Sequence, residues 1–256
     1  MARIFITGST DGLGRRVAEI LIGDGHEVVL HARNEERRKD VMSTVQGVAV
    51  LVADLSLVAE IKELAATVNN IGPFDAILHN AGVGYHGRIR GNTTEGLPPL
   101  FVVNTLAPYI LTCLVKKPGR LLYISSGLHT HGDSSLQDLT WDKRLWSGYK
   151  AYADSKLHDL ILALAVARKW SDVLSNAINP GWIATKMGGG RAPDSLTKGS
   201  QTQVWLAVSD DDAAQVSGKY FQHMRQKYFL NAASNEDIQD QLLANCAQIS
   251  GVSFPP

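Results

Sequence analysis

Two tyrosines and two lysines stand in the short run YKAYADSK at residues 149–156, and one pairing among them is suited to chemistry. Tyr152 and Lys156 are four residues apart, so they share one face of a helix. Tyr149 has no lysine at that spacing, and Lys150 points to another face. An ammonium beside a phenol favours the phenolate, which prepares a tyrosine to exchange a proton with a carbonyl or an alcohol. The spacing predicts an acid/base pair, and an exposed Tyr-Lys contact without function is the alternative.

A second candidate is the glycine-rich segment TGSTDGLG at residues 7–14, which directly follows an apolar run. Gly8, Gly12 and Gly14 permit a tight turn and let the backbone approach a pyrophosphate. The helix that follows would direct its free N–H groups and its positive dipole end at the phosphates. The spacing G-x-x-x-G-x-G differs from the commoner G-x-G-x-x-G, and an ordinary glycine-rich turn is the alternative. Lys-Ser/Thr does not follow the last glycine, so the segment is not a P-loop.

The residues after the second apolar run, EVVLHA at 27–32, favour one form of nicotinamide dinucleotide. NAD usually meets an acid there, which bonds the ribose 2′-hydroxyl, whereas an arginine accommodates the 2′-phosphate of NADP. This chain has Arg33 at that place, and its acids come later, at Glu35 and Glu36. A guanidinium can bond a phosphate in bidentate fashion, so Arg33 favours NADP(H) over NAD(H). The other nearby arginines are interpreted as solvated surface charges: Arg16, Arg37 and Arg38.

Short apolar runs that alternate with longer amphipathic segments must position these residues. The runs are β-branched and bounded by Gly, Asn or Asp, which is typical of buried strands. The alternation predicts right-handed βαβ units, that is, an α/β fold with a doubly wound parallel sheet of about seven strands and helices on both faces. A ligand binds such a sheet at the carboxyl ends of its strands, near the topological switch point. The predicted strands are 3–7, 27–32, 47–52, 74–79, 119–125, 173–178 and 218–222, and the clearest predicted helix is 149–170.

Composition and charge restrict the class of protein. The 256 residues are 45% hydrophobic, and Lys+Arg equal Asp+Glu at 25 each, so the formal net charge is zero. This balance gives no electrostatic footprint for nucleic acid or an anionic membrane. Two cysteines, Cys113 and Cys246, cannot form a disulfide framework and fit a reducing compartment. The N-terminal apolar run is too short for a signal or a membrane span, so we expect a cytoplasmic protein with a single domain over residues 1–256.

In combination and in this order, the motifs resemble the short-chain dehydrogenase/reductase family over nearly the whole chain. TGSTDGLG is similar to the family's T-G-x-x-x-G-x-G, HNAG contains its N-A-G, and YADSK fits its Y-x-x-x-K. VVNTLAPY, YISSGLH and NPGWIATKM are similar to its V-N segment, its serine-bearing strand end and its P-G-x-x-x-T segment. The resemblance implies a single-domain Rossmann fold. It also implies an NADP(H)-dependent oxidoreductase that moves a hydride between the nicotinamide and a ketone, an aldehyde or a secondary alcohol.

The resemblance assigns roles to residues one position at a time. Tyr152 would be the acid/base, and Lys156 would bond the nicotinamide ribose and tune the tyrosine. Asn104 would hold a water for proton relay, and Ser126 would polarise the substrate carbonyl, with Ser125 as the alternative serine. Asp54 with Leu55 would contact the adenine, and Ile183 with Thr185 the carboxamide. The positions implied for the cofactor are Gly8, Ser9, Gly12, Leu13, Gly14, Arg33, Asp54, Leu55, Asn80, Ala81, Gly82, Tyr152, Lys156, Pro180, Gly181, Ile183 and Thr185.

Residues 127–148 lengthen the interval before Tyr152 relative to the most compact members of the family. This interval, and the segment P-G-W-x-x-T-K-M, resemble the retinol-dehydrogenase-like and WW-domain-oxidoreductase-like branches. The insertion starts at the serine, so it could form a wall of the substrate pocket, with His129, Trp141 and Trp146 in contact. A surface loop packed on the edge of the sheet is the alternative.

Two later segments are also distinctive. Residues 186–199, KMGGGRAPDSLTKG, contain three consecutive glycines and a proline, which predicts a mobile segment. The family covers its substrate with this region, and a lid that excludes water suits hydride transfer. The tail at 235–256 resembles a short amphipathic helix with a frayed end, packed on the domain or on a neighbouring subunit.

The expected partner is a small-molecule carbonyl or alcohol. The resemblance also implies a homodimer or homotetramer through the helices that bear Asn104 and Tyr152. We expect no nucleic acid, membrane or metal partner, since His129-x-His131 has no evident third ligand. Two alternatives stay open: an epimerase or dehydratase that acts on a nucleotide sugar, and a non-catalytic NADP(H) sensor.

Overall fold

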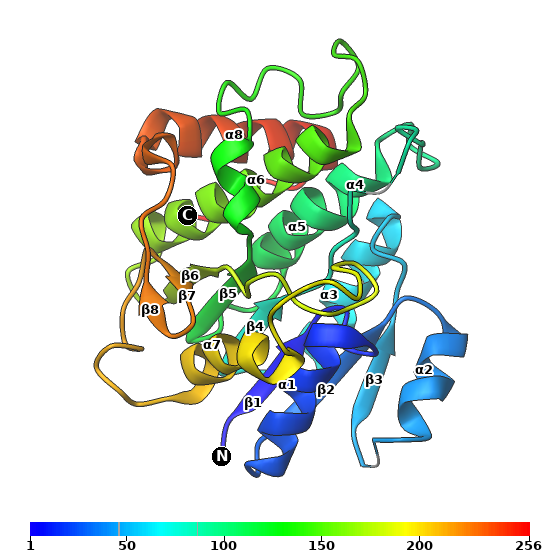
Figure 1. Cartoon of the computed structure of the whole chain (residues 1–256), viewed down its shortest axis with the longest axis vertical. Helices are drawn as coiled ribbons and strands as arrows, with labels where there is room; N and C mark the ends of the chain where they lie inside the picture. Colours follow the sequence, from blue (N-terminus) through cyan, green and yellow to red (C-terminus); the bar gives the residue numbers. More distant parts are fainter. Residues whose placement is uncertain (46, 86) are drawn as a thin grey trace.

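The computed structural model describes residues 1–45, 47–85 and 87–256, and the eight strands found there form one sheet (Figure 1). Their order is β3-β2-β1-β4-β5-β6-β7-β8, and every pairing is parallel except that of β7 with β8. The strands are β1 (Arg3–Ile6), β2 (Glu27–Ala32), β3 (Ala49–Val52), β4 (Ala76–His79), β5 (Arg120–Ile124), β6 (Leu174–Ile178), β7 (Lys219–Gln222) and β8 (Arg225–Gln226). The predicted α/β fold with a doubly wound sheet is confirmed, with one strand more than expected.

The chain winds outward from the middle of the sheet in two directions. It runs from β1 to β2 and β3, crosses back to β4 on the other side of β1, and continues to β5, β6 and β7. The strand order therefore reverses between β1 and β4. That reversal is the topological switch point at which sheets of this type bind ligands.

Alternate residues of each buried strand enter two hydrophobic layers. In β1, Ile4 and Ile6 belong to one cluster and Phe5 to the other. The first cluster lies under α1 and α7, and the second lies under α3, α5 and α6. Burial on both faces explains why these strands are apolar without alternation. The helices are α1 (Gly12–Gly23), α2 (Glu35–Met42), α3 (Val58–Ile71), α4 (Pro99–Phe101), α5 (Ala107–Leu114), α6 (Gly148–Lys169), α7 (Leu196–Val208) and α8 (Glu236–Ser250).

The C-terminal helix α8 packs across α6 and α5 (Figure 1). After α8, the Tyr109 hydroxyl of α5 donates to the Val252 carbonyl at 2.8 Å, and Phe254 stacks on Trp170 with ring centroids 5.0 Å apart. The expectation of a frayed end is therefore wrong, because the last apolar side chains cover Trp170. In the part of the chain that the structure describes, no helix is long and apolar enough to cross a membrane.

Candidate active site

A cleft of about 960 Å³ lies at the carboxyl ends of the central strands. It is lined by the loops that follow β1, β4, β5 and β6, so it coincides with the switch point. Nearly all of the expected site positions line it. The two exceptions are Ser9 and Asn104, which are buried behind the wall.

The glycine-rich turn has no room for side chains at two positions. Gly8 has a φ of +61°, and a Cβ there would lie 2.8 Å from the Ala81 Cα. A Cβ on Gly14 would lie 2.3 Å from the Nδ2 atom of Asn80. The Asn80 amide donates to the carbonyls of Thr7 and Gly8 at 2.9 and 3.0 Å. The segment after β4 therefore braces the turn, and the N-terminus of α1 faces the cleft, an arrangement that fits a dinucleotide pyrophosphate.

His31 is a buried part of this site that sequence analysis did not single out. Its Nδ1 atom accepts a hydrogen bond from the Gly8 N–H at 2.9 Å, and its Nε2 atom donates to the Ala53 carbonyl at 2.9 Å. Burial lowers the pKa of His31 to about 4, so the ring is neutral near pH 7. Ser9 lies beside it, fully buried, with its hydroxyl between the Ile6 carbonyl and the His31 N–H. His31 and Ser9 therefore support the glycine-rich turn from the buried interior.

Two arginines border the outer end of the cleft. Arg33 lines it and is exposed. Arg37 also lines it, with Nη1 3.6 Å from the Asp11 carboxylate, and its side chain is 40% exposed, so it is a solvated charge at the border of the cleft. Asn34 caps α2, and its side chain accepts the backbone N–H of Arg37 in the first turn of the helix. Arg16 and Arg38 form helix-surface ion pairs with Glu19 and Glu35, as interpreted.

Tyr152 and Lys156 share one face of α6, with the lysine Nζ 5.6 Å from the tyrosine ring centroid. The Tyr152 hydroxyl lies 3.9 Å from the sulfur of Met187. The Lys156 ammonium is buried and donates to the Ile124 carbonyl at 2.7 Å and to the Asp159 carboxylate at 2.8 Å. Burial works to lower the pKa of Lys156, but the charges of Asp159 and Tyr152 prevail and hold it above its ordinary value.

Asn104 lies in a π-helical turn, η1 (Val102–Leu106), between α4 and α5. Such turns often occur at functional sites. Its amide oxygen accepts from the Val83 N–H at 2.8 Å, and its amide nitrogen donates to the Val83 carbonyl and the Ser155 hydroxyl. A Cβ on Gly82 would lie 3.5 Å from Asn104 Oδ1 and 3.8 Å from Lys156 Nζ. Asn104 therefore fixes the loop after β4 against α6, directly beside Lys156.

The two serines after β5 differ in what their hydroxyls do. Ser125 is buried, and its hydroxyl donates to the backbone carbonyl of Lys156 at 2.7 Å. Ser126 is half-buried, and its Oγ accepts from the Leu128 N–H at 3.2 Å. Both serines line the cleft. The Ser126 hydroxyl proton can therefore be directed at a ligand, whereas the Ser125 proton is committed to α6. This geometry favours Ser126 over Ser125.

The insertion packs against α6, and only its first two residues, Gly127 and Leu128, are among those that line the cleft in the described part of the chain. Trp141 is buried and lies edge-on to Trp146, with ring centroids 5.5 Å apart. The Trp146 indole N–H donates to the Gly87 carbonyl. His129 is buried, and its Nε2 accepts from the Leu230 N–H at 3.3 Å. The expectation that His129, Trp141 and Trp146 contact substrate is therefore wrong, because each is used to pack the insertion onto the domain.

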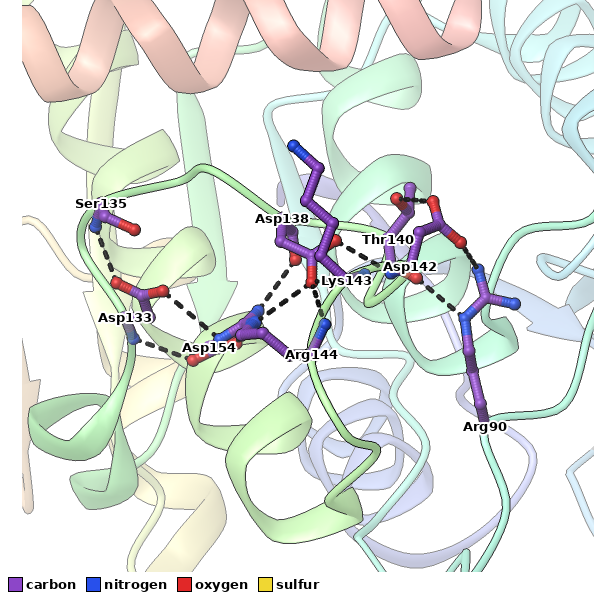
Figure 2. Close-up of polar contacts among 9 residues, drawn as sticks. All are labelled: Arg90, Asp133, Ser135, Asp138, Thr140, Asp142, Lys143, Arg144 and Asp154. Carbon is purple, nitrogen blue, oxygen red and sulfur yellow. Dashed lines mark hydrogen bonds and ion pairs between the residues drawn. The ribbon is translucent and has the colours of Figure 1, made fainter.

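Arg144 holds the insertion together (Figure 2). Its guanidinium lies 3.9 Å over the Trp141 ring, 3.3 Å from the Asp133 carboxylate and 2.9 Å from the Asp154 carboxylate. Asp138 accepts the backbone N–H groups of residues 142, 143 and 144. Asp154 belongs to α6, so this cluster ties the insertion to the helix that carries Tyr152 and Lys156.

Aromatic and apolar side chains border the Tyr152 end of the cleft. Tyr85 lies edge-on to both Tyr149 and Tyr152, with centroids 6.0 and 5.5 Å apart. The Tyr149 hydroxyl lies 2.7 Å from Nδ1 of His131. Trp182 and Met187 line the same cleft, and Trp182 is 54% exposed.

The expected lid begins at the cleft and ends in a helix. Lys186 lies 2.5 Å from the Asp11 carboxylate at the start of α1, and the Trp182 indole donates to the Gly188 carbonyl at 2.8 Å. A Cβ on Gly12 would lie 3.6 Å from the Thr185 methyl, so the glycine-rich turn and this segment face each other. The last four residues of the predicted lid, 196–199, already belong to α7.

Comparisons with known proteins identify the family. A family profile described as enoyl-(acyl carrier protein) reductase matches residues 8–215. The chain is 43% identical over 260 residues to the short-chain dehydrogenase chyC of Penicillium rubens, covering 100% of both chains. The chain belongs to the short-chain dehydrogenase/reductase family. It is therefore an oxidoreductase of a family that uses a nicotinamide cofactor.

A more distant relative agrees with the expected branch, and a solved structure agrees with the expected fold. Human retinol dehydrogenase 13 is 29% identical over 286 residues, covering 98% of this chain and 85% of the relative. An uncharacterized protein from Mycobacterium paratuberculosis has a crystal structure with a TM-score of 0.85, at 23% identity over 100% of this chain and 96% of that one. The resemblance to the retinol-dehydrogenase-like branch is thus confirmed. Among the described residues, no cluster of His, Cys, Asp and Glu is suited to hold a metal ion.

Proposed function

We propose that this short-chain dehydrogenase/reductase is an NADP(H)-dependent carbonyl reductase or alcohol dehydrogenase with Tyr152 as its acid/base. The observation that carries the proposal is the meeting of Tyr152, Lys156 and Ser126 with the glycine-rich turn on one cleft. The nicotinamide, when bound, supplies or accepts the hydride. The residues that would hold the cofactor are those of the turn, the Asn80–Gly82 segment and the loop from Pro180 to Thr185.

The side chains divide the proton chemistry between them. In the reductive direction, the Tyr152 hydroxyl gives its proton to the carbonyl oxygen as the carbonyl carbon is reduced. The Ser126 hydroxyl donates a second hydrogen bond to that oxygen, where negative charge develops. The Lys156 ammonium stabilises the phenolate left on Tyr152. Asn104 holds the loop after β4 in place beside Lys156.

Arg33 and Arg37 support NADP(H) as the cofactor. Both line the same end of the cleft, beyond β2, where a 2′-phosphate would lie. Glu35 and Glu36 follow on α2 and do not line the cleft. Guanidinium groups bond phosphate strongly, so the pair favours the phosphorylated cofactor.

The border of the cleft supports an apolar or aromatic carbonyl as substrate. Tyr85, Tyr149, Trp182 and Met187 surround the Tyr152 end, and aromatic rings there can pack against a flat or apolar molecule. The name of one relative, retinol dehydrogenase, agrees with an apolar alcohol or aldehyde. A nucleotide sugar would need cationic or polar contacts at this end instead.

The test is cofactor turnover with a panel of ketones, aldehydes and alcohols, run with NADPH/NADP and with NADH/NAD. We expect NADPH to be preferred, and a strong preference for NADH would overturn the role of Arg33. Tyr152→Phe should abolish turnover while NADPH still binds, because the mutation removes one hydroxyl. Tyr228→Phe, at a fully exposed ring, is the matched control. Wild-type turnover by purified Y152F would contradict the assignment.

A further inference from the structure

Lys156 has an acidic partner inside the core. The carboxylate of Asp159 lies 2.8 Å from the Lys156 Nζ atom, and the two side chains are 3% and 5% exposed. Asp159 follows three residues after Lys156 on α6, so the two occupy the same face of the helix. None of the roles that the family resemblance implies falls on Asp159.

The contact uses one of three ammonium protons. A second is donated to the Ile124 carbonyl at 2.7 Å, which leaves the third toward Gly82 and Tyr152. A buried ammonium without a counter-charge is costly, and a buried carboxylate at hydrogen-bond distance offsets that cost. Asp159 therefore fixes both the position and the charge of Lys156.

We propose that Asp159 is a positioning residue that sets the proton affinity of the Tyr152–Lys156 pair. This inference rests on the proposed function of Tyr152 and Lys156. A negative charge beside the pair opposes the loss of a proton from either member, whether the phenol or the ammonium gives it up. The pair therefore keeps its proton to a higher pH than it would with a neutral side chain at residue 159.

Six other titratable groups packed around this part of α6 are neutral near pH 7, and the charged Asp154 is paired with Arg144, so none of these shares the role. Burial raises the pKa of the phenol and thiols and lowers the pKa of the imidazoles. These groups are Tyr123 of β5, Cys113 of α5, Cys246 of α8, His79 of β4, His158 of α6 and His129 after β5. Burial raises the pKa of Asp159 itself to about 6, which leaves it charged at neutral and alkaline pH. The exchange of protons and charge is therefore confined to Asp159, Lys156 and Tyr152.

The test is the pH dependence of kcat, in both reaction directions, for Asp159→Asn. Asn has the shape and hydrogen-bonding capacity of Asp without its charge. We expect the midpoint of carbonyl reduction, which needs the protonated pair, to move to lower pH. The midpoint of alcohol oxidation, which needs the deprotonated pair, should move in the same direction. A shift of about one pH unit or more is expected for a charge at this range.

Asp154→Asn is the matched control. Asp154 is also a buried carboxylate of α6, two residues from both Tyr152 and Lys156, but it bonds Arg144 of the insertion. Its replacement should leave the pH midpoint where it is, whatever it does to thermal stability. Asp159→Glu keeps the charge and should keep a midpoint near that of the wild type.

A D159N enzyme with the wild-type midpoint would overturn the inference and leave Asp159 a purely structural residue. If Asn at residue 159 prevents folding, Asp159→Ser removes the same charge with less bulk, and the same shift is expected. Failure of the proposed function is seen separately, since it would appear as turnover by Y152F. An unchanged midpoint in D159N, beside an inactive Y152F, overturns only the role of Asp159.

Discussion

Residues that line the cleft hold one another in place through hydrogen bonds. The Asn80 amide bonds the carbonyls of Thr7 and Gly8, and His31 accepts the N–H of Gly8 from the opposite side. The turn that would cradle a pyrophosphate is therefore fixed before any ligand arrives. Preorganisation of this kind lowers the ordering cost of binding.

Gly14→Ala should break this arrangement. The added Cβ would lie 2.3 Å from Asn80 Nδ2 and 2.6 Å from the Gly8 carbonyl, so the turn or Asn80 must move. We expect NADPH affinity to fall about tenfold or more, which corresponds to about 1.4 kcal/mol. Overpacking of this kind should also lower the free energy of unfolding by about 1–3 kcal/mol. Fluorescence titration and urea unfolding measure the two effects.

Gly23→Ala is the control for this prediction, at the last residue of the same helix. A Cβ at residue 23 would meet no heavy atom within 4 Å in the described part of the chain. Its NADPH affinity should match that of the wild type. Equal affinity in G14A would show that the turn tolerates a side chain.

The site residues that sequence predicts are those whose role follows from local spacing. Tyr152 and Lys156 follow from one helical turn, and the glycine-rich turn follows from its place after a strand. His31 and Asp159 are not predicted, because their roles depend on tertiary contacts in the buried interior. His31 reaches a turn 23 residues earlier in the chain, and Asp159 occupies an ordinary core position of α6.

Among the elements, the insertion is the clearest departure from expectation. Its first two residues, Gly127 and Leu128, line the cleft, whereas Arg144 ties the rest to α6 and not to the edge of the sheet. Arg144 determines this packing, because it forms ion pairs with Asp133, Asp138 and Asp154 and lies over the Trp141 ring. A pattern of residue types does not reveal that four side chains converge on one guanidinium.

Arg144→Met should destabilise the domain while kcat stays close to the wild-type value. The substitution leaves the buried Asp154 carboxylate without its cation, and Arg144 itself is 30% exposed. Loss of one partner of a buried pair costs about 3–5 kcal/mol, and partial exposure reduces this to about 2 kcal/mol here. Urea unfolding measures the change.

The double variant R144M/D154N tests whether the contact is the cause. Asn at residue 154 removes the stranded charge, so the double variant should be more stable than the sum of the single effects predicts. Additive effects would mean that Arg144 and Asp154 do not act through each other.

The strand β8 shows why one element escapes sequence analysis. It pairs with β7 through a turn in which His223 and Met224 have φ values of 52° and 59°. Tight hairpin turns of this kind usually carry Asn or Gly, and this one carries neither. The parallel strands, by contrast, are predicted because short apolar runs mark them directly.

For the whole molecule, the placement of α8 bears on assembly. The expected homodimer or homotetramer would use the helices that bear Asn104 and Tyr152. The structure packs α8 and the residues after it onto α5 and α6, and most of α6 is buried within one chain. α8 therefore covers part of the surface of these helices. The oligomeric state stays a prediction, and light scattering measures it.

The free energy of unfolding should depend on pH through buried histidines. Burial lowers the pKa of His31 to about 4 and those of His79 and His158 to about 3. An unfolded histidine has a pKa of about 6.5. Below that pH the unfolded chain takes up protons that the folded chain does not, so stability falls toward the folded pKa values. Asp159, with its pKa raised to about 6, opposes this between about pH 6 and 4 and offsets one histidine.

Urea unfolding between about pH 7 and 4.5 measures this loss. Each histidine contributes at most about 1.36 kcal/mol per pH unit below its unfolded pKa. His79→Leu is the informative variant, because His79 Nδ1 has no hydrogen-bond partner among the described residues. Its unfolding free energy should fall less steeply with acidity than that of the wild type. A flat profile in the wild type would contradict the prediction.

The burial of α6 has a consequence for how the enzyme loses activity on heating. This helix carries Tyr152 and Lys156, is tied to the insertion through Asp154, and lies beneath α8. Elements with so many buried contacts do not open locally; they open only with the whole domain. On heating, the loss of activity and the unfolding of the domain should therefore occur at the same temperature. At no intermediate temperature should the domain be folded while α6 has melted.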